Sequence, residues 1–131
     1  MNAPIGVFDS GVGGLTVARE IMRQLPEESM NIFGDTARVP YGTKSKDTNR
    51  ALFQTDRHFC LSKGVKAVVI ACNTASALAL ADLQELYNVP IIGMVQPGAI
   101  AAMNATKNKN IGIIGTNATI KSGQYGQYLR N

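Results

Sequence analysis

The sequence predicts an α/β fold in which a mostly parallel sheet is covered by helices on both faces. Short apolar runs rich in β-branched residues alternate with longer stretches whose apolar residues recur at helical spacing, a pattern typical of βαβ units. The run Val68-Val69-Ile70 is apolar at each position, as expected for a strand that helices bury on both sides. With 45% hydrophobic and 17% charged residues among 131, the composition excludes a disordered or collagen-like chain.

The expected strands and helices follow one another along the whole chain. The strands cover residues 4–8, 30–33, 65–71, 90–94 and 111–115. Helical spacing is clearest at 15–25, which ends before Pro26, and at 75–86, which ends before Pro90. We expect further helices at 46–63, 97–106 and 119–130. No strand follows the last helix, so we expect a sheet that lacks its final strands.

The charge balance favours a small anionic substrate over a nucleic acid. Thirteen Lys and Arg residues against nine Asp and Glu give a net charge of +4, but the basic residues form no Arg-rich block interleaved with aromatics. No apolar run approaches the roughly 20 residues that cross a bilayer. The two cysteines are not at metal-ligand spacing. We therefore expect a cytoplasmic protein with reduced thiols, no metal site and no nucleic-acid or membrane partner.

Polar residues stand directly after several expected strands, and their placement predicts a ligand site. The carboxyl ends of parallel strands meet at one edge of a sheet, where ligands bind. The residues at these ends are Asp9-Ser10-Gly11, Gly34-Asp35-Thr36, Cys72-Asn73-Thr74, and Thr116 with Thr119. The glycine-rich segment 11–14 lacks the spacing of a dinucleotide loop or a P-loop. Two interpretations of this segment stay open: a tight turn, or an anion site at the N-terminus of the next helix.

Cys72 has the setting of a reactive thiol. It follows an apolar strand and precedes Asn73 and Thr74, which both suit the cap of the next helix. A thiolate is stabilised at a helix N-terminus, so Cys72 could serve in proton transfer; the alternative is a small buried hydrophobic residue. The other cysteine, Cys60, lies inside an expected helix and is interpreted as a core residue.

Four blocks of sequence, spread through almost the whole chain, match one known family. They are IGVFDSGVGGLTV at 5–17, GDTARVPYG at 34–42, ACNTASA at 71–77 and GTNAT at 115–119. In these blocks the chain closely resembles the N-terminal half of the cofactor-independent aspartate/glutamate racemases. Several long motifs in the family's order are far more specific than a lone glycine loop. The first two blocks look more like the glutamate-specific members than the aspartate racemases.

The resemblance implies an enzyme that interconverts L- and D-glutamate without a cofactor, and so supplies D-glutamate for peptidoglycan and the cell wall. It implies two α/β domains facing each other across the substrate, with one cysteine base on each face of Cα. Cys72 matches the first cysteine, and Asp9 matches the acidic helper beside it. The matching substrate-binding positions are Asp9, Ser10, Tyr41, Gly42, Asn73, Thr74, Thr116 and Thr119.

The sequence also departs from the family pattern. The second catalytic cysteine, expected in a Gly-Cys-Thr-His type motif, has no counterpart, and Gln96 stands where an acidic residue is expected before Pro97. We interpret residues 1–95 as a first racemase domain without its C-terminal return, and 96–131 as the start of the second. The hypotheses are one half of a glutamate racemase, with a homodimer as one assembly; an aspartate racemase; or a catalytically silent chain that binds acidic amino acids or a partner chain.

Overall fold

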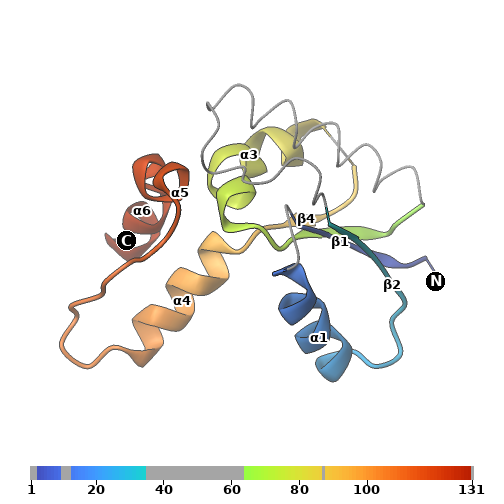
Figure 1. Ribbon diagram of the computed structural model, residues 1–131, viewed down its shortest axis with the longest axis horizontal. Helices are drawn as coiled ribbons and strands as arrows, with labels where there is room; N and C mark the ends of the chain where they lie inside the picture. Colours follow the sequence, from blue (N-terminus) through green and yellow to red (C-terminus); the bar gives the residue numbers. More distant parts are fainter. Residues whose placement is uncertain (1–2, 10–12, 35–63, 87, 131) are drawn as a thin grey trace.

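The described residues form a parallel sheet of four strands. The computed structural model describes residues 3–9, 13–34, 64–86 and 88–130 (Figure 1). The strands, in the order β2-β1-β3-β4, are β2 (Met30–Gly34), β1 (Ile5–Asp9), β3 (Ala67–Ile70) and β4 (Ile91–Ile92). The helices are α1 (Gly14–Gln24), α3 (Asn73–Leu86), α4 (Val95–Ala105), α5 (Asn117–Ser122) and α6 (Gln124–Arg130). The predicted fold class is confirmed; no described helix is long and apolar enough to span a membrane.

Two apolar clusters lie on opposite faces of the sheet, because successive strand residues point to opposite sides. Val7 and Val69 pack with Ala18 of α1 on one face. Phe8 and Ile70 belong to the cluster on the other face, which includes buried residues of α3. All five residues of β1 are buried, as the continuous apolar pattern of a central strand predicts. Helices α1 and α3 therefore cover the two faces of the sheet (Figure 1).

Ser76 of α3 connects the end of β3 to the start of α4. Its Oγ donates a hydrogen bond to the carbonyl oxygen of Ile70 at 3.1 Å and accepts one from the N–H of Met94 at 2.9 Å. Gly93 permits this approach, because a Cβ at that position would lie 3.0 Å from Ser76 Oγ. The strand predicted at 90–94 is short for this reason: β4 ends before Met94, whose N–H bonds to a side chain instead of to a neighbouring strand.

Replacement of Ser76 by alanine is expected to lower the free energy of unfolding by about 2 kcal/mol, because it takes the side-chain partner from the buried carbonyl of Ile70 and from the part-buried N–H of Met94. The matched control is Ser29→Ala, since Ser29 is exposed and its loss should change stability by less than about 0.5 kcal/mol. Urea unfolding followed by circular dichroism measures both. Equal midpoints for the two variants would show that Ser76 does not hold this junction.

Two expectations for the C-terminal part are wrong. The segment 111–115 is not a strand: it leads from α4 to α5 beside no described strand, and Ile114 is fully exposed (Figure 1). β-Branched residues favour a strand only where a neighbouring strand can pair with them. The helix expected at 119–130 is two helices, since Gly123 has a φ of 70° and its left-handed conformation ends α5. The helix expected at 46–63 lies outside the described residues.

Candidate functional site

The carboxyl ends of β1 and β3 lie side by side and bring together two residues singled out from the sequence. Phe8 is opposite Ile70 in the parallel register, and the N–H of Ala71 donates to the carbonyl oxygen of Phe8 at 2.7 Å. Asp9 therefore ends β1 close to the point where the chain leaves β3 and reaches Cys72. Helix α3 begins at the next residue, so its N-terminus also lies at this edge.

The Asp9 carboxylate is buried and held by the first residue of α1. Its Oδ2 accepts a hydrogen bond from the N–H of Gly14 at 2.6 Å. Position 14 requires glycine, because a Cβ there would lie 2.7 Å from the Cβ of Asp9. A carboxylate is favoured at a helix N-terminus, where N–H groups have no helical partner. The chain's own aspartate thus occupies the N–H of Gly14. Residues 11 and 12 of the glycine-rich segment lie outside the described residues, so its two interpretations both stay predictions.

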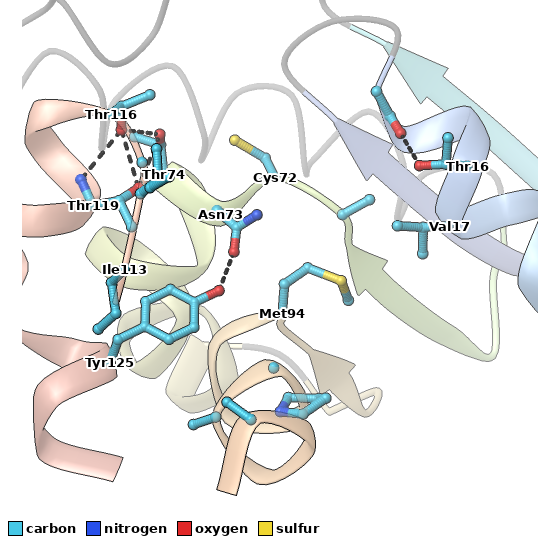
Figure 2. Close-up of a pocket in the computed structure, with 18 of the residues that line it drawn as sticks. Thr16, Val17, Cys72, Asn73, Thr74, Met94, Ile113, Thr116, Thr119 and Tyr125 are labelled. Carbon is cyan, nitrogen blue, oxygen red and sulfur yellow. Dashed lines mark hydrogen bonds between the residues drawn. The ribbon is translucent and has the colours of Figure 1, made fainter. Parts of the chain in front are cut away.

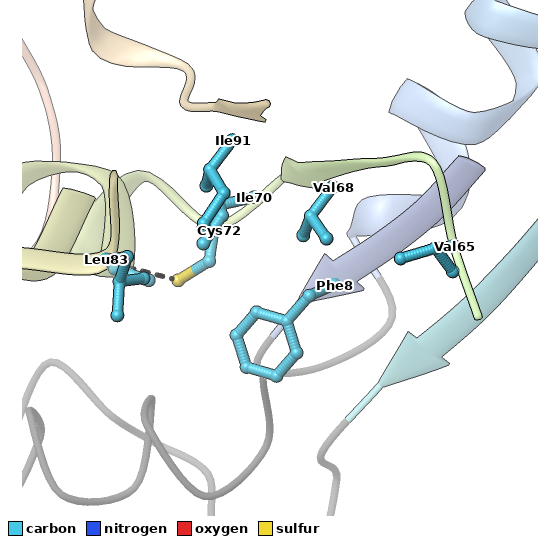
Figure 3. Close-up of a cluster of buried hydrophobic side chains, with 8 residues drawn as sticks. Phe8, Val65, Val68, Ile70, Cys72, Leu83 and Ile91 are labelled. Atoms are coloured by element: carbon cyan, nitrogen blue, oxygen red, sulfur yellow. Dashed lines mark hydrogen bonds between the residues drawn. The ribbon is translucent and has the colours of Figure 1, made fainter. Parts of the chain in front are cut away.

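Cys72 lies between an apolar cluster and the site. The residue is 6% exposed, and its side chain packs in the cluster that contains Phe8, Ile70 and Leu83 (Figure 3). Its Sγ also accepts a hydrogen bond from the N–H of Ala75 at 3.4 Å, in the first turn of α3. Both sequence interpretations thus describe part of its setting: Cys72 is a buried residue, and its sulfur is held at the N-terminus of a helix that borders a cavity.

Three threonine hydroxyls meet where α3 contacts α5. Thr74 Oγ1 lies 2.8 Å from Thr116 Oγ1 and 3.4 Å from Thr119 Oγ1, and the last two are 3.0 Å apart. Thr116 also caps α5, because its Oγ1 accepts from the N–H of Thr119 at 3.2 Å. Thr74 and Thr119 are buried. The cluster joins two chain segments that the sequence separates by 42 residues.

Asn73, the first residue of α3, is exposed and bonds to a residue that the sequence analysis missed. The hydroxyl of Tyr125 in α6 donates to Asn73 Oδ1 (Figure 2). Burial raises the pKa of Tyr125 above its ordinary value, so this phenol stays protonated at neutral pH. No sequence pattern pointed to Tyr125, because 52 residues separate it from Asn73.

One cavity of about 810 Å³ collects the described candidate residues (Figure 2). Those that line it are Asp9, Cys72, Asn73, Thr74, Thr116 and Thr119. Met94, Tyr125 and the segment 111–114 also line it and were not predicted as site residues. The predicted positions Ser10, Tyr41 and Gly42 lie outside the described residues. Within the described part of the chain, no three His, Cys, Asp or Glu residues are grouped so that they could hold a metal ion.

The chain is similar in sequence to known proteins over nearly its whole length. Residues 5–131 match the family model described as Asp/Glu/Hydantoin racemase. A glutamate racemase from Oceanobacillus iheyensis is 53% identical over 129 residues, which are 98% of this chain and 47% of that protein. The chain spans about half the length of the curated relatives it matches.

Solved structures of similar proteins have the same fold over this region. A glutamate racemase isoform from Bacillus anthracis superposes with a TM-score of 0.94 at 49% identity, covering 98% of this chain and 48% of that one. A glutamate racemase from Francisella tularensis, solved in complex with D-glutamate, superposes with a TM-score of 0.90 at 42% identity and the same coverage. The similarity therefore extends from the sequence to the backbone that positions the cavity.

Proposed function

This chain belongs to the Asp/Glu/Hydantoin racemase family, and from that premise we propose that it forms one half of the active site of a glutamate racemase. The observation that carries the proposal is the cavity at the carboxyl edge of the sheet, which Cys72, Asp9 and polar residues of α3 and α5 line together. In this proposal residues 1–95 are the first domain and 96–131 begin the second. The substrates are L- and D-glutamate, and no cofactor takes part.

Cys72 is proposed as the base on one face of the substrate. Racemisation removes the Cα proton from one face and returns a proton to the other. The Cys72 thiolate takes the Cα proton and becomes a thiol, while the electron pair of the C–H bond passes into the α-carboxylate. An acid on the opposite face then gives its proton to Cα, which inverts the centre. The Ala75 N–H bond holds the sulfur in place, and proton transfer needs such fixed geometry.

The charge that develops on the α-carboxylate needs fixed hydrogen-bond donors. Asn73 Nδ2 and the hydroxyls of the threonine cluster are donors of this kind, and they line the same cavity as the sulfur. Asp9, fixed through Gly14, is proposed as the acidic helper that assists proton exchange and attracts the substrate ammonium. Ser10, Tyr41 and Gly42 complete the proposed set from outside the described residues.

The second acid–base group is proposed to come from beyond these 131 residues. The sequence has no second motif of the expected type, and the relatives are about twice as long as the region they share with this chain. The remaining half of a longer protein would supply the group; a second copy of this chain, as a homodimer, is the competing source. The D-glutamate produced would serve peptidoglycan synthesis in the cytoplasm.

A joined protein tests this proposal. It carries the 131 residues followed by the part of the Oceanobacillus iheyensis relative that lies beyond the matched region. We expect the joined protein to convert L- to D-glutamate, followed by the change in optical rotation, and the 131-residue chain alone to bind L-glutamate with little turnover. Turnover by the chain alone that rises with the square of its concentration would favour the homodimer.

Two further outcomes would contradict the proposal. Conversion of L-aspartate but not of L-glutamate by the joined protein would identify an aspartate racemase. A joined protein that unfolds cooperatively and binds glutamate but inverts neither amino acid would support a catalytically silent binding chain.

A further inference from the structure

Tyr125 links the C-terminal helices to the residue beside the cysteine. Its hydroxyl donates to Asn73 Oδ1, and its ring lies against Gly98 of α4, where a Cβ would be 3.4 Å from Cε1 and from the hydroxyl oxygen. Because Asn73 is the first residue of α3, this bond reaches the helix N-terminus that holds the Cys72 sulfur. The phenol is thus fixed by one helix and bonded to another.

The bond sets which end of the Asn73 side chain faces the cavity. A carboxamide has an acceptor oxygen on one side and a donor NH₂ group on the other. With Oδ1 bonded to Tyr125, Nδ2 lies on the opposite side, and Figure 2 shows the nitrogen on the side of Cys72. An anionic ligand in the cavity then meets two N–H donors. With the amide reversed, it would meet the carbonyl oxygen, which repels a carboxylate.

The chemistry of the Tyr125 hydroxyl favours one of the two orientations of the Asn73 amide. A partly buried phenol O–H needs an acceptor, and Asn73 Oδ1 is the acceptor given by the structure. The side chain of Asn73 is otherwise exposed, so close packing against the described residues does not hold the amide in one of its two orientations. The hydroxyl of Tyr125, which is 52 residues away in the sequence, selects the orientation of the Asn73 amide through this hydrogen bond.

We propose that Tyr125 is a positioning residue that turns the Asn73 amide so that its NH₂ group faces the ligand carboxylate. The identity of that ligand rests on the proposed function, but the orientation of the amide does not. Tyr125 acts through Asn73 and does not itself touch the reacting atoms in this proposal.

The test compares Tyr125→Phe with Tyr128→Phe, which removes the same hydroxyl from another tyrosine of α6. L-Glutamate is titrated into the ¹⁵N-labelled 131-residue chain and binding is followed by NMR. We expect Tyr125→Phe to weaken L-glutamate binding about tenfold, the scale of one hydrogen bond to a charged group, and Tyr128→Phe to leave it unchanged. Adding Tyr125→Phe to Asn73→Ala should weaken binding no further, because the two residues act as one unit.

The side-chain NH₂ signals of Asn73, assigned by their loss in Asn73→Ala, separate this inference from the proposed function. We expect them to shift in Tyr125→Phe and to stay in place in Tyr128→Phe, with or without glutamate. If the wild-type chain does not bind glutamate, the proposed function loses support while these signals still decide the positioning. Unchanged NH₂ signals in Tyr125→Phe would overturn the inference. Wild-type glutamate affinity in that variant, alongside weakened binding in Asn73→Ala, would overturn it as well.

Discussion

A Cys72→Ser variant of the joined protein is expected to racemise glutamate about 10³- to 10⁴-fold more slowly than the parent, the scale lost with an essential acid–base group. Serine has nearly the same shape, and its hydroxyl can still accept from the Ala75 N–H. The hydroxyl, however, is far harder to ionise than a thiol, so it cannot take the Cα proton at neutral pH. The measurement is the initial rate of optical rotation change at saturating L-glutamate, together with the melting temperature of the variant.

Two comparisons make the Cys72 result specific. Cys60→Ala removes the only other sulfhydryl of the chain and should leave the rate within about threefold of the parent, since no role in proton transfer is proposed for it. Glutamate binding by Cys72→Ser should change much less than the rate, because the carboxylate donors stay in place. Parent-like turnover in a folded Cys72→Ser protein would remove Cys72 from its proposed role.

An Asp9→Asn variant of the joined protein is expected to lower the rate about 10²-fold, less than Cys72→Ser, with only a small change in stability. The asparagine Oδ1 can still accept from the N–H of Gly14, so the end of β1 and the start of α1 stay joined by a hydrogen bond. The variant removes the negative charge and the proton-accepting group from the cavity wall. The rate and the melting temperature together separate loss of chemistry from loss of fold.

Glu85→Gln is the charge-matched control for Asp9. Glu85 is an exposed residue of α3, so its replacement removes the same charge without touching the cavity, and the rate should stay near that of the parent. An Asp9→Asn protein with an unchanged rate would show that Asp9 only holds the start of α1. A rate lost in parallel with a lowered melting temperature would lead to the same conclusion.

The sheet could be predicted from local sequence because its central strands are buried on both faces. Val7 and Phe8 contact different layers of helices, and both layers require an apolar side chain, so the strand appears as an unbroken apolar run. The segment 111–115, Ile-Gly-Ile-Ile-Gly, is likewise apolar and yet forms no strand in the described structure. The central strands have neighbouring strands to pair with, and the segment 111–115 has none among the described residues. The composition of a segment does not reveal this difference. The break between α5 and α6 comes from the left-handed backbone conformation of Gly123, which the helical spacing of apolar residues likewise does not reveal.

The site could be predicted in part, by the rule that strand ends of a parallel sheet meet at one edge. This rule singled out Asp9, Cys72 and the two residues after Cys72, which line one cavity in the structure. It could not give the environment of the sulfur, because packing against Phe8 and bonding to Ala75 depend on how α3 lies on the sheet. The roles of these residues stay predictions until the variants are measured.

By itself, the sequence determined the parallel sheet, the family and the strand ends that carry polar side chains, since periodicity and motif order are local properties of a chain. Only the tertiary structure decided that Tyr125 bonds to Asn73 and that Thr74 meets Thr116 and Thr119. These partners lie 42 to 52 residues apart. Their hydrogen bonds exist only because α5 and α6 pack against α3 and α4, and the direction of such packing follows from the sum of many side-chain contacts.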